Sequence, residues 1–181
     1  NKVEIYTDGR SKFNDLLHDL RNARKSINLQ YYIFDDDATG RMVRDILIER
    51  ARAGVAVRVV YDHVGSFSTR TRFFKEMRRE GIMAYPFFKV TFPQLGTRIN
   101  WRNHRKIVVI DGHIGYLGGM NIADRYITGG KFPRWRDTHL RITGPAVAGL
   151  QFSFAIDWNF MGQPLIEDHV SLEAPPDGNV G

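Results

Sequence analysis

Hydrophobic residues recur along the chain with two alternating periods, which together predict an alternation of strands and helices. Short β-branched or alternating apolar runs predict strands at 3–7, 27–34, 55–62, 82–87 and 138–143. Apolar spacings of three and four residues predict helices at 11–26, with Ser11 as the N-cap, and at 39–54, 69–80 and 145–161. This order predicts an α/β layered sandwich with a mixed, mostly parallel central sheet and helices on both faces.

The pattern changes after the fourth predicted strand. Residues 87–101 show no clean period, which predicts a long surface loop of the kind that often carries function. Two short apolar runs then flank Asp111-Gly112, a pair typical of a hairpin turn. The segment from Pro164 onward resembles a linker, so we expect a single domain at 1–163 and a linker-like tail at 164–181.

Composition narrows the class of protein without choosing its chemistry. A chain of 181 residues with 43% hydrophobic content is long enough to bury one sizeable core. It has no cysteine, which excludes disulfides and thiolate metal sites. The formal charge of +6 predicts affinity for anions, and nucleic acid, a phospholipid surface and a phosphorylated substrate all satisfy it.

A cluster of polar residues surrounds the predicted hairpin. If a strand begins just ahead of His104, that residue and Lys106 share one face, because side chains alternate along a strand. Beyond the hairpin the chain adds backbone room and an amide donor: Gly118, Gly119 and Asn121. A point cation, an amide and accessible backbone are the groups that hold a phosphate, which leaves the imidazole as the candidate reacting group.

The spacing of these residues resembles a known motif. The pattern His-x-Lys-x4-Asp-x6-Gly-Gly-x-Asn at 104–121 resembles the HKD motif of the phospholipase D superfamily. Four longer segments, 28–40, 54–66, 102–126 and 135–147, resemble the first catalytic half of a bacterial cardiolipin synthase, so the likeness covers essentially the whole chain. The pair Gly118-Gly119 replaces the more general Gly-Ser, as is common in bacterial cardiolipin synthases.

The resemblance implies phosphodiester chemistry without a metal or other cofactor. One histidine attacks the phosphorus to give a phosphohistidine, and a second histidine protonates the leaving alcohol. The catalytic residues it implies are His104, Lys106, Asp111 and Asp137, and the phosphate-binding residues are Lys106, Gly118, Gly119 and Asn121. His104 is expected to be the nucleophile and Asp137 to orient its imidazole. Turn chemistry alone explains an aspartate before glycine, so for Asp111 we favour a structural role.

The chain holds one such motif, whereas the family chemistry requires two. We therefore expect a second HKD half beyond residue 181 of a longer parent, or pairing of two copies, and favour the first. The implied reaction joins two phosphatidylglycerol molecules and releases glycerol. The implied partner is an anionic phospholipid, and the implied location is the bacterial cell membrane, as the peripheral catalytic domain of a membrane-anchored parent.

Two other hypotheses remain open at this point, and a third, a zinc site, is set aside. The positive charge also suits a homodimeric single-motif phosphodiesterase or nuclease, with nucleic acid as its partner. A non-catalytic phospholipid-binding module would need only the phosphate-binding residues. A zinc site of His104, His113 and His139 has no recognised ligand spacing, and we expect no metal.

Overall fold

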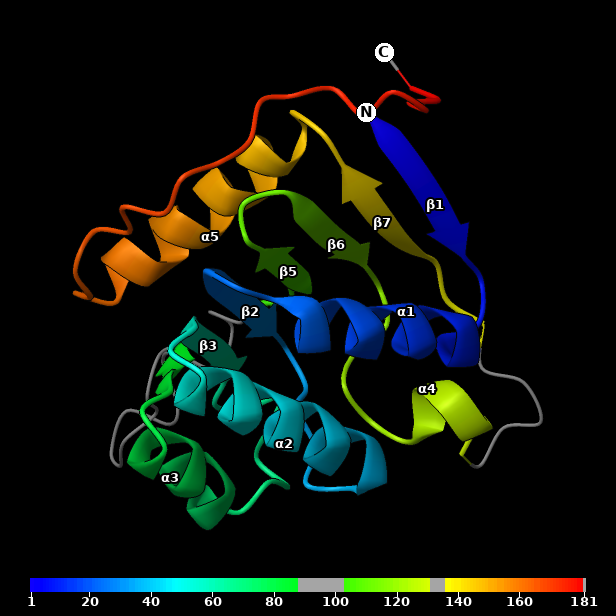
Figure 1. The fold of residues 1–181 in the computed structure, drawn as a ribbon. Helices are drawn as coiled ribbons and strands as arrows, with labels where there is room; N and C mark the ends of the chain where they lie inside the picture. Colours follow the sequence, from blue (N-terminus) through cyan, green and yellow to red (C-terminus); the bar gives the residue numbers. More distant parts are fainter. Residues whose placement is uncertain (88–102, 131–135, 181) are drawn as a thin grey trace.

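One mixed sheet organises the chain, with helices packed on both of its faces (Figure 1). The computed structural model describes residues 1–87, 103–130 and 136–180, so most of the loop predicted at 87–101 lies outside the described residues. The strands are β1 (Lys2–Tyr6), β2 (Ser26–Tyr31), β3 (Ala56–Asp62), β4 (Met83–Phe87), β5 (Ile107–Ile110), β6 (Ile114–Gly118) and β7 (His139–Thr143). The helices are α1 (Gly9–Asn22), α2 (Ala38–Arg52), α3 (Thr71–Arg79), α4 (Arg125–Thr128) and α5 (Val147–Phe160).

The strand order across the sheet is β1-β7-β6-β5-β2-β3-β4. The α/β layers, the mixed sheet and the predicted hairpin β5–β6 are confirmed. The expectation of a mostly parallel sheet needs correction, because only β2–β3 and β3–β4 are parallel neighbours in the described sheet. The pairs β1–β7, β7–β6, β6–β5 and β5–β2 are antiparallel. For the hairpin β5–β6 the physical reason is connection length: the three residues between Ile110 and Ile114 are too few for the crossover that a parallel pair requires.

Aspartate side chains set where the first two helices begin. Asp8 is the N-cap of α1, since its carboxylate accepts the backbone N–H of Ser11 at 2.9 Å. Ser11 therefore lies inside the helix, and the prediction that it caps the helix is wrong. Asp37 caps α2 in the same way, accepting the N–H of Gly40 at 2.9 Å. Each cap satisfies one of the backbone donors that a helix N-terminus leaves without an internal partner.

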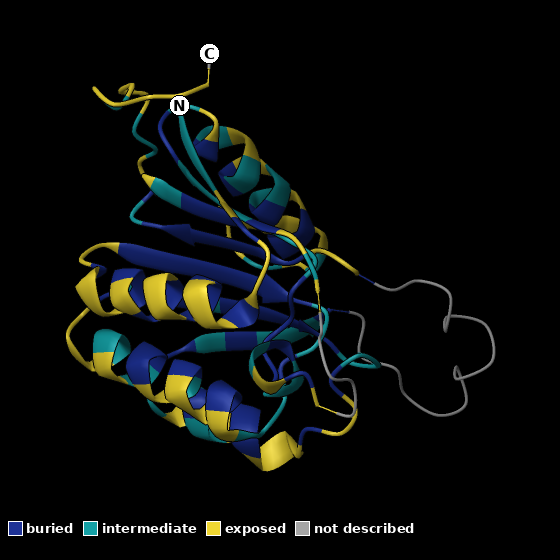
Figure 2. Ribbon diagram, turned by 90° about the vertical axis from the view of Figure 1, so that its right-hand side faces the viewer, coloured by how far each residue is buried: buried dark blue, intermediate teal, exposed yellow. Residues whose placement is uncertain are grey.

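The hydrophobic core lies on both sides of the sheet. Helices α1, α2 and α3 cover one face and bury the largest cluster, while α5 covers the other face. Strand β5 contributes side chains to the core on both faces of the sheet. Val108 and Ile110 belong to the first cluster, and Ile107 and Val109 belong to the cluster under α5. Figure 2 shows the strands as mainly buried and the helices as exposed mainly along their outer faces. A strand buried on both faces gives the residues at its ends a rigid support.

The segment after α5 runs back along the domain toward the N-terminus (Figure 1). Trp158 Nε1 donates to the carbonyl of Pro164 at 3.0 Å, and Asp168 forms an ion pair with Arg58 at 2.7 Å. Farther on, the terminal amine of Asn1 donates to the carbonyl of Val180 at 2.9 Å. The described part of the predicted tail is thus bonded to the domain along its length, and the boundary near residue 163 stays a prediction.

Candidate active site

His104 lies three residues before the first residue of β5, beside the C-terminal end of β2. Strand β5 runs antiparallel to β2, with Ile107 opposite Gln30, so the start of one lies beside the end of the other. The exposed imidazole of His104 stacks on the ring of Tyr32, with centroids 4.0 Å apart and an interplanar angle of 16°. A reacting group must reach solvent and keep its direction, and stacking on one face allows both.

Lys106 lies behind this stack and is largely buried, with 9% of its surface exposed. Its Nζ donates to the carbonyl of His104 at 2.7 Å and lies 5.6 Å from the centroid of the Tyr32 ring. Burial lowers the pKa of the Lys106 ammonium, and the negative charge of Asp137 opposes that shift. Strand alternation was predicted to place His104 and Lys106 on one face, but β5 begins only at Ile107. The two residues are instead brought together by their shared contacts with Tyr32 and by the bond from Lys106 Nζ to the His104 carbonyl.

The two glycines after β6 make room for side chains of this same chain. A Cβ at Gly118 would lie 2.5 Å from Nδ1 of His139, and a Cβ at Gly119 would lie 2.0 Å from Oδ1 of Asp137. Neither position accepts a side chain without moving its neighbour. In the direction of a Cβ, the space at these glycines is occupied by His139 and Asp137, and the phosphate-binding role expected of the glycines stays a prediction. The absence of a side chain at Gly119 therefore allows Asp137 to pack against this part of the backbone.

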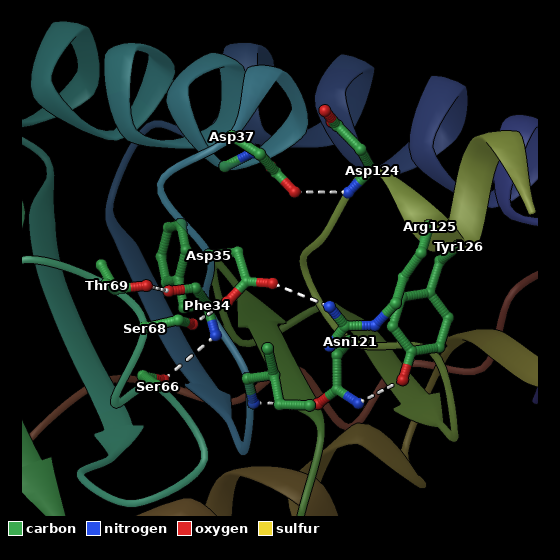
Figure 3. A network of polar contacts seen from close by, with 12 residues as sticks. Phe34, Asp35, Asp37, Ser66, Ser68, Thr69, Asn121, Asp124, Arg125 and Tyr126 are labelled. Atoms are coloured by element: carbon green, nitrogen blue, oxygen red, sulfur yellow. Dashed lines mark hydrogen bonds and ion pairs between the residues drawn. The ribbon is translucent and has the colours of Figure 1, made fainter. Parts of the chain in front are cut away.

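Asn121 is buried and its amide has a defined orientation (Figure 3). Its Oδ1 accepts the backbone N–H of Ile33 at 3.0 Å, and its Nδ2 donates to the hydroxyl of Tyr126 at 2.7 Å. Ile33 follows Tyr32, so this bond connects Asn121 to the backbone that carries the stacking ring. Nδ2 has two hydrogens, and the phosphate-binding role expected of Asn121 would fall to the one not donated to Tyr126.

A polar network holds the segment around Asn121 against the end of β2 (Figure 3). Arg125 Nη1 forms an ion pair with Asp35 at 2.9 Å, and the backbone N–H of Asp124 donates to Asp37 at 2.6 Å. On the other side, Ser66 Oγ accepts the N–H of Phe34 at 3.1 Å. Three chain segments are thereby fixed around the residues that follow Tyr32, which limits how far the stacking ring can move.

Asp111 lies at the opposite end of β5, in the hairpin turn, and adopts a positive φ of 53°. Its carboxylate accepts backbone N–H groups of Arg24 at 2.9 Å, Lys25 at 2.7 Å and Ser26 at 2.9 Å. Four strand residues alone span roughly 13 Å, so the structure does not bring Asp111 to His104. The contacts of Asp111 connect the hairpin to the start of β2.

His139 and Lys12 are two buried titratable residues beside the site, and neither belongs to the HKD motif. His139 is fully buried, and neither ring nitrogen has a hydrogen-bond partner among the described residues. Burial, with smaller contributions from Lys12 and Lys106, lowers the pKa of His139 to about 2. Lys12 is also fully buried and donates to the hydroxyl of Tyr31 at 3.1 Å, and burial holds its pKa well below the usual range. In the sequence, the feature that could have indicated this buried lysine is its position among the apolar residues of the first helix.

The three histidines considered for zinc do not come together. His113 lies in the hairpin turn, at the far end of β5 from His104, and His139 is buried at the start of β7. Within residues 1–87, 103–130 and 136–180, no group of three or more His, Asp or Glu side chains could hold a metal ion.

A mixed sheet that presents a histidine and a lysine before one strand of a hairpin, and Gly-Gly-x-Asn after the other, defines a phospholipase D-like domain. Solved structures agree on the fold. A phospholipase D family member, Nuc from Salmonella typhimurium, superposes with a TM-score of 0.62 at 15% identity, covering 94% of this chain and all of that one. The phosphatidylserine synthase of Haemophilus influenzae Rd KW20 gives 0.66 at 18% identity, covering 87% of this chain and 36% of that one.

Sequence comparison identifies the family. The model described as "Cardiolipin synthase, PLD-like domain" matches residues 16–146, and the chain belongs to this family. It is 45% identical over its whole length to the major cardiolipin synthase ClsA of Bacillus subtilis (strain 168) and 46% identical to a cardiolipin synthase of Staphylococcus aureus (strain Mu50). The chain spans 38% of the first relative and 37% of the second. No helix in the described part is long and apolar enough to cross a membrane.

Proposed function

We propose that the chain supplies the first half of the active site of a phospholipase D-type phosphatidyltransferase that makes cardiolipin from two phosphatidylglycerol molecules. The observation that carries the proposal is the pairing of an exposed imidazole with a buried ammonium on one tyrosine ring, His104 and Lys106 on Tyr32. Similarity of the whole of this chain to part of proteins named cardiolipin synthase supports the choice of substrate.

In the proposed first step, a ring nitrogen of His104 forms a bond to the phosphorus of one phosphatidylglycerol. The bond from phosphorus to the glycerol head-group oxygen breaks, and a second histidine gives that oxygen its proton, which releases glycerol. In the second step the same histidine takes the proton from a glycerol hydroxyl of another phosphatidylglycerol. That oxygen attacks the phosphorus, the P–N bond breaks, and His104 is regenerated.

Lys106 and Asp137 have complementary roles in this scheme. Negative charge builds on the non-bridging phosphate oxygens in each transition state, and a desolvated ammonium stabilises it more than a hydrated one would. Burial alone would favour the neutral amine, so the nearby carboxylate of Asp137 helps to keep Lys106 charged. Asn121 would add one amide N–H to the same oxygens.

The scheme needs a second histidine in addition to His104. We propose that it comes from a second HKD half of a longer protein, since the relatives are more than twice as long as this chain. We also propose that the protein works at the bacterial membrane, where its phospholipid substrate is found.

The test uses the protein in its full natural length with vesicles of phosphatidylglycerol labelled in the phosphate. We expect labelled cardiolipin, free glycerol, and a protein-bound label that is labile in acid and stable in alkali. His104→Ala should abolish all three. The matched control is His113→Ala, which removes an exposed histidine at the far end of β5 and should leave turnover unchanged. Unchanged cardiolipin formation in His104→Ala would refute the proposal.

The net charge of +6 keeps one alternative, a nuclease formed by two copies of the chain. Cleavage of DNA by the 181-residue chain, insensitive to chelator and lost in His104→Ala, together with no product from phosphatidylglycerol, would favour it over lipid transfer.

A further inference from the structure

One carboxylate oxygen receives three side-chain donors just behind the candidate nucleophile. Oδ2 of Asp157, on α5, accepts Gln30 Nε2 at 2.6 Å, Asn103 Nδ2 at 2.7 Å and a guanidinium N–H of Arg105. Asp157 is 6% exposed, whereas the Arg105 side chain is 51% exposed. A buried carboxylate needs such compensation, because an unpaired charge away from water is strongly destabilising.

Two of the three donors flank His104 in the sequence. The side chains of Asn103 and Arg105 both reach toward α5, and the backbone N–H of Arg105 donates to Asn103 Oδ1 at 3.1 Å. A second buried carboxylate, Asp62 at the end of β3, accepts the backbone N–H of Asn103 at 3.1 Å. The chain is thus fixed immediately before and immediately after His104.

This arrangement compensates for the late start of β5. The sheet begins to hold the chain only at Ile107, so no ladder hydrogen bonds fix the direction of the His104 side chain. If the side chains on both sides are bound to α5, His104 is left to point the other way, onto the ring of Tyr32.

We infer that Asp157 is a positioning residue: it binds Asn103 and Arg105 so that the imidazole of His104 stays stacked on Tyr32 and aimed at the phosphorus. Its catalytic consequence rests on the proposed nucleophilic role of His104, whereas its structural consequence does not. An asparagine at 157 would keep the volume but lose the charge that pairs with Arg105. Its amide nitrogen would also place a donor near groups that already donate.

The test compares Asp157→Asn with a matched control, Asp19→Asn, in the full-length protein. Asp19 is also 6% exposed and also accepts two side-chain donors on one oxygen, from Tyr116 at 2.5 Å and Arg141 at 2.7 Å, but its partners do not flank His104. We expect similar losses in Tm. In Asp157→Asn kcat should fall by about tenfold or more with KM nearly unchanged, since only the approach of the nucleophile is altered. In Asp19→Asn kcat should stay within about twofold.

A spectroscopic measurement separates positioning from the reaction itself. In protein labelled at histidine with 13C, the ring signal of His104, assigned by its loss in His104→Gln, should carry the shift caused by the stacked Tyr32 ring. Asp157→Asn should remove that shift and Asp19→Asn should keep it. The inference is overturned if the shift survives in Asp157→Asn, or if both variants remove it alike. An inactive natural protein, or an active His104→Ala, would defeat the proposed function and leave this measurement standing.

If Asp157→Asn does not fold, Arg105→Met gives the same information from an exposed side chain. It removes one of the three donors, and we expect a partial loss of the His104 shift and a fall of about threefold in kcat. A His104 signal and turnover identical to those of the natural protein would overturn the inference.

Discussion

The two ends of β5 carry residues of a single eight-residue motif, yet they are built for different purposes. At the start of the strand, His104 is exposed and oriented by a ring stack, and Lys106 is buried beside it. At the other end, Asp111 accepts backbone N–H groups from three consecutive residues, 24 to 26. One end presents an exposed imidazole beside a buried ammonium, and the other end uses its carboxylate to connect β5 to β2. The motif thus encodes both a candidate reactive end and the frame that supports it.

The largest effect is expected from replacing the buried cation at the reactive end. Lys106→Met should lower kcat by about 10²–10³-fold, because the transition-state charge loses its desolvated partner. The free energy of unfolding should change little, since an apolar side chain suits a largely buried position. Steady-state turnover and denaturant unfolding of the same preparations test both parts, with exposed Lys75→Met as the control. A stable but fully active Lys106→Met would show that the two ends do not differ as proposed.

At the Asp111 end of β5 we expect a loss of stability rather than a loss of turnover. Asp111→Ala leaves three backbone N–H groups without their acceptor, and should lower the free energy of unfolding by about 2–4 kcal/mol. Turnover per folded molecule should stay within about threefold. Urea unfolding followed by circular dichroism measures the first, and activity normalised to folded protein measures the second. A large loss of kcat in well-folded Asp111→Ala would place this residue in the chemistry after all.

Acid should lower the free energy of unfolding through His139, which is buried beside the reactive end. Its pKa is about 2 when folded and about 6.5 when unfolded, so below pH 6.5 the unfolded chain binds a proton that the folded chain does not. The stabilisation is complete above pH 6.5 and declines as the pH falls toward 2, by about 2 kcal/mol at pH 5. His139→Leu should remove this part of the pH dependence, whereas exposed His113→Leu should keep it. Parallel stability curves for the natural protein and His139→Leu between pH 7 and 5 would contradict the prediction.

Local patterns were sufficient to predict much of the fold. The hairpin β5–β6 follows from two apolar runs around Asp111-Gly112, and helices α1, α2, α3 and α5 follow from their apolar spacing. The sheet order was not predictable in this way. The pairing of β5 with β2 and of β7 with β1 joins residues 77 or more positions apart, and local periodicity does not indicate which strands pair.

The candidate site shows the same limit. The motif located His104, Lys106 and Asn121, but the structure brings in Tyr32 and Asp157 from segments about 70 residues before and 50 residues after the histidine. A tyrosine at the end of a strand and an aspartate on a helix have no local feature that distinguishes them from ordinary surface residues. Their roles arise from packing, which places them beside residues that the sequence pattern alone does identify.

The smallest effect on kcat is expected from removing the ring stack at the reactive end. His104 lies outside the backbone ladder of β5, so the stack on Tyr32 contributes to holding its imidazole in place. Tyr32→Leu removes the ring on which His104 stacks and should reduce kcat by about tenfold, about 1.4 kcal/mol of activation free energy. Tyr32→Phe keeps the ring and should restore most of the activity, which turnover of the two variants on phosphatidylglycerol vesicles measures. Equal activity of both variants with the natural protein would mean that the flanking contacts to Asp157 are sufficient. Equal loss in both would mean that the hydroxyl, and not the stack, is what the site requires.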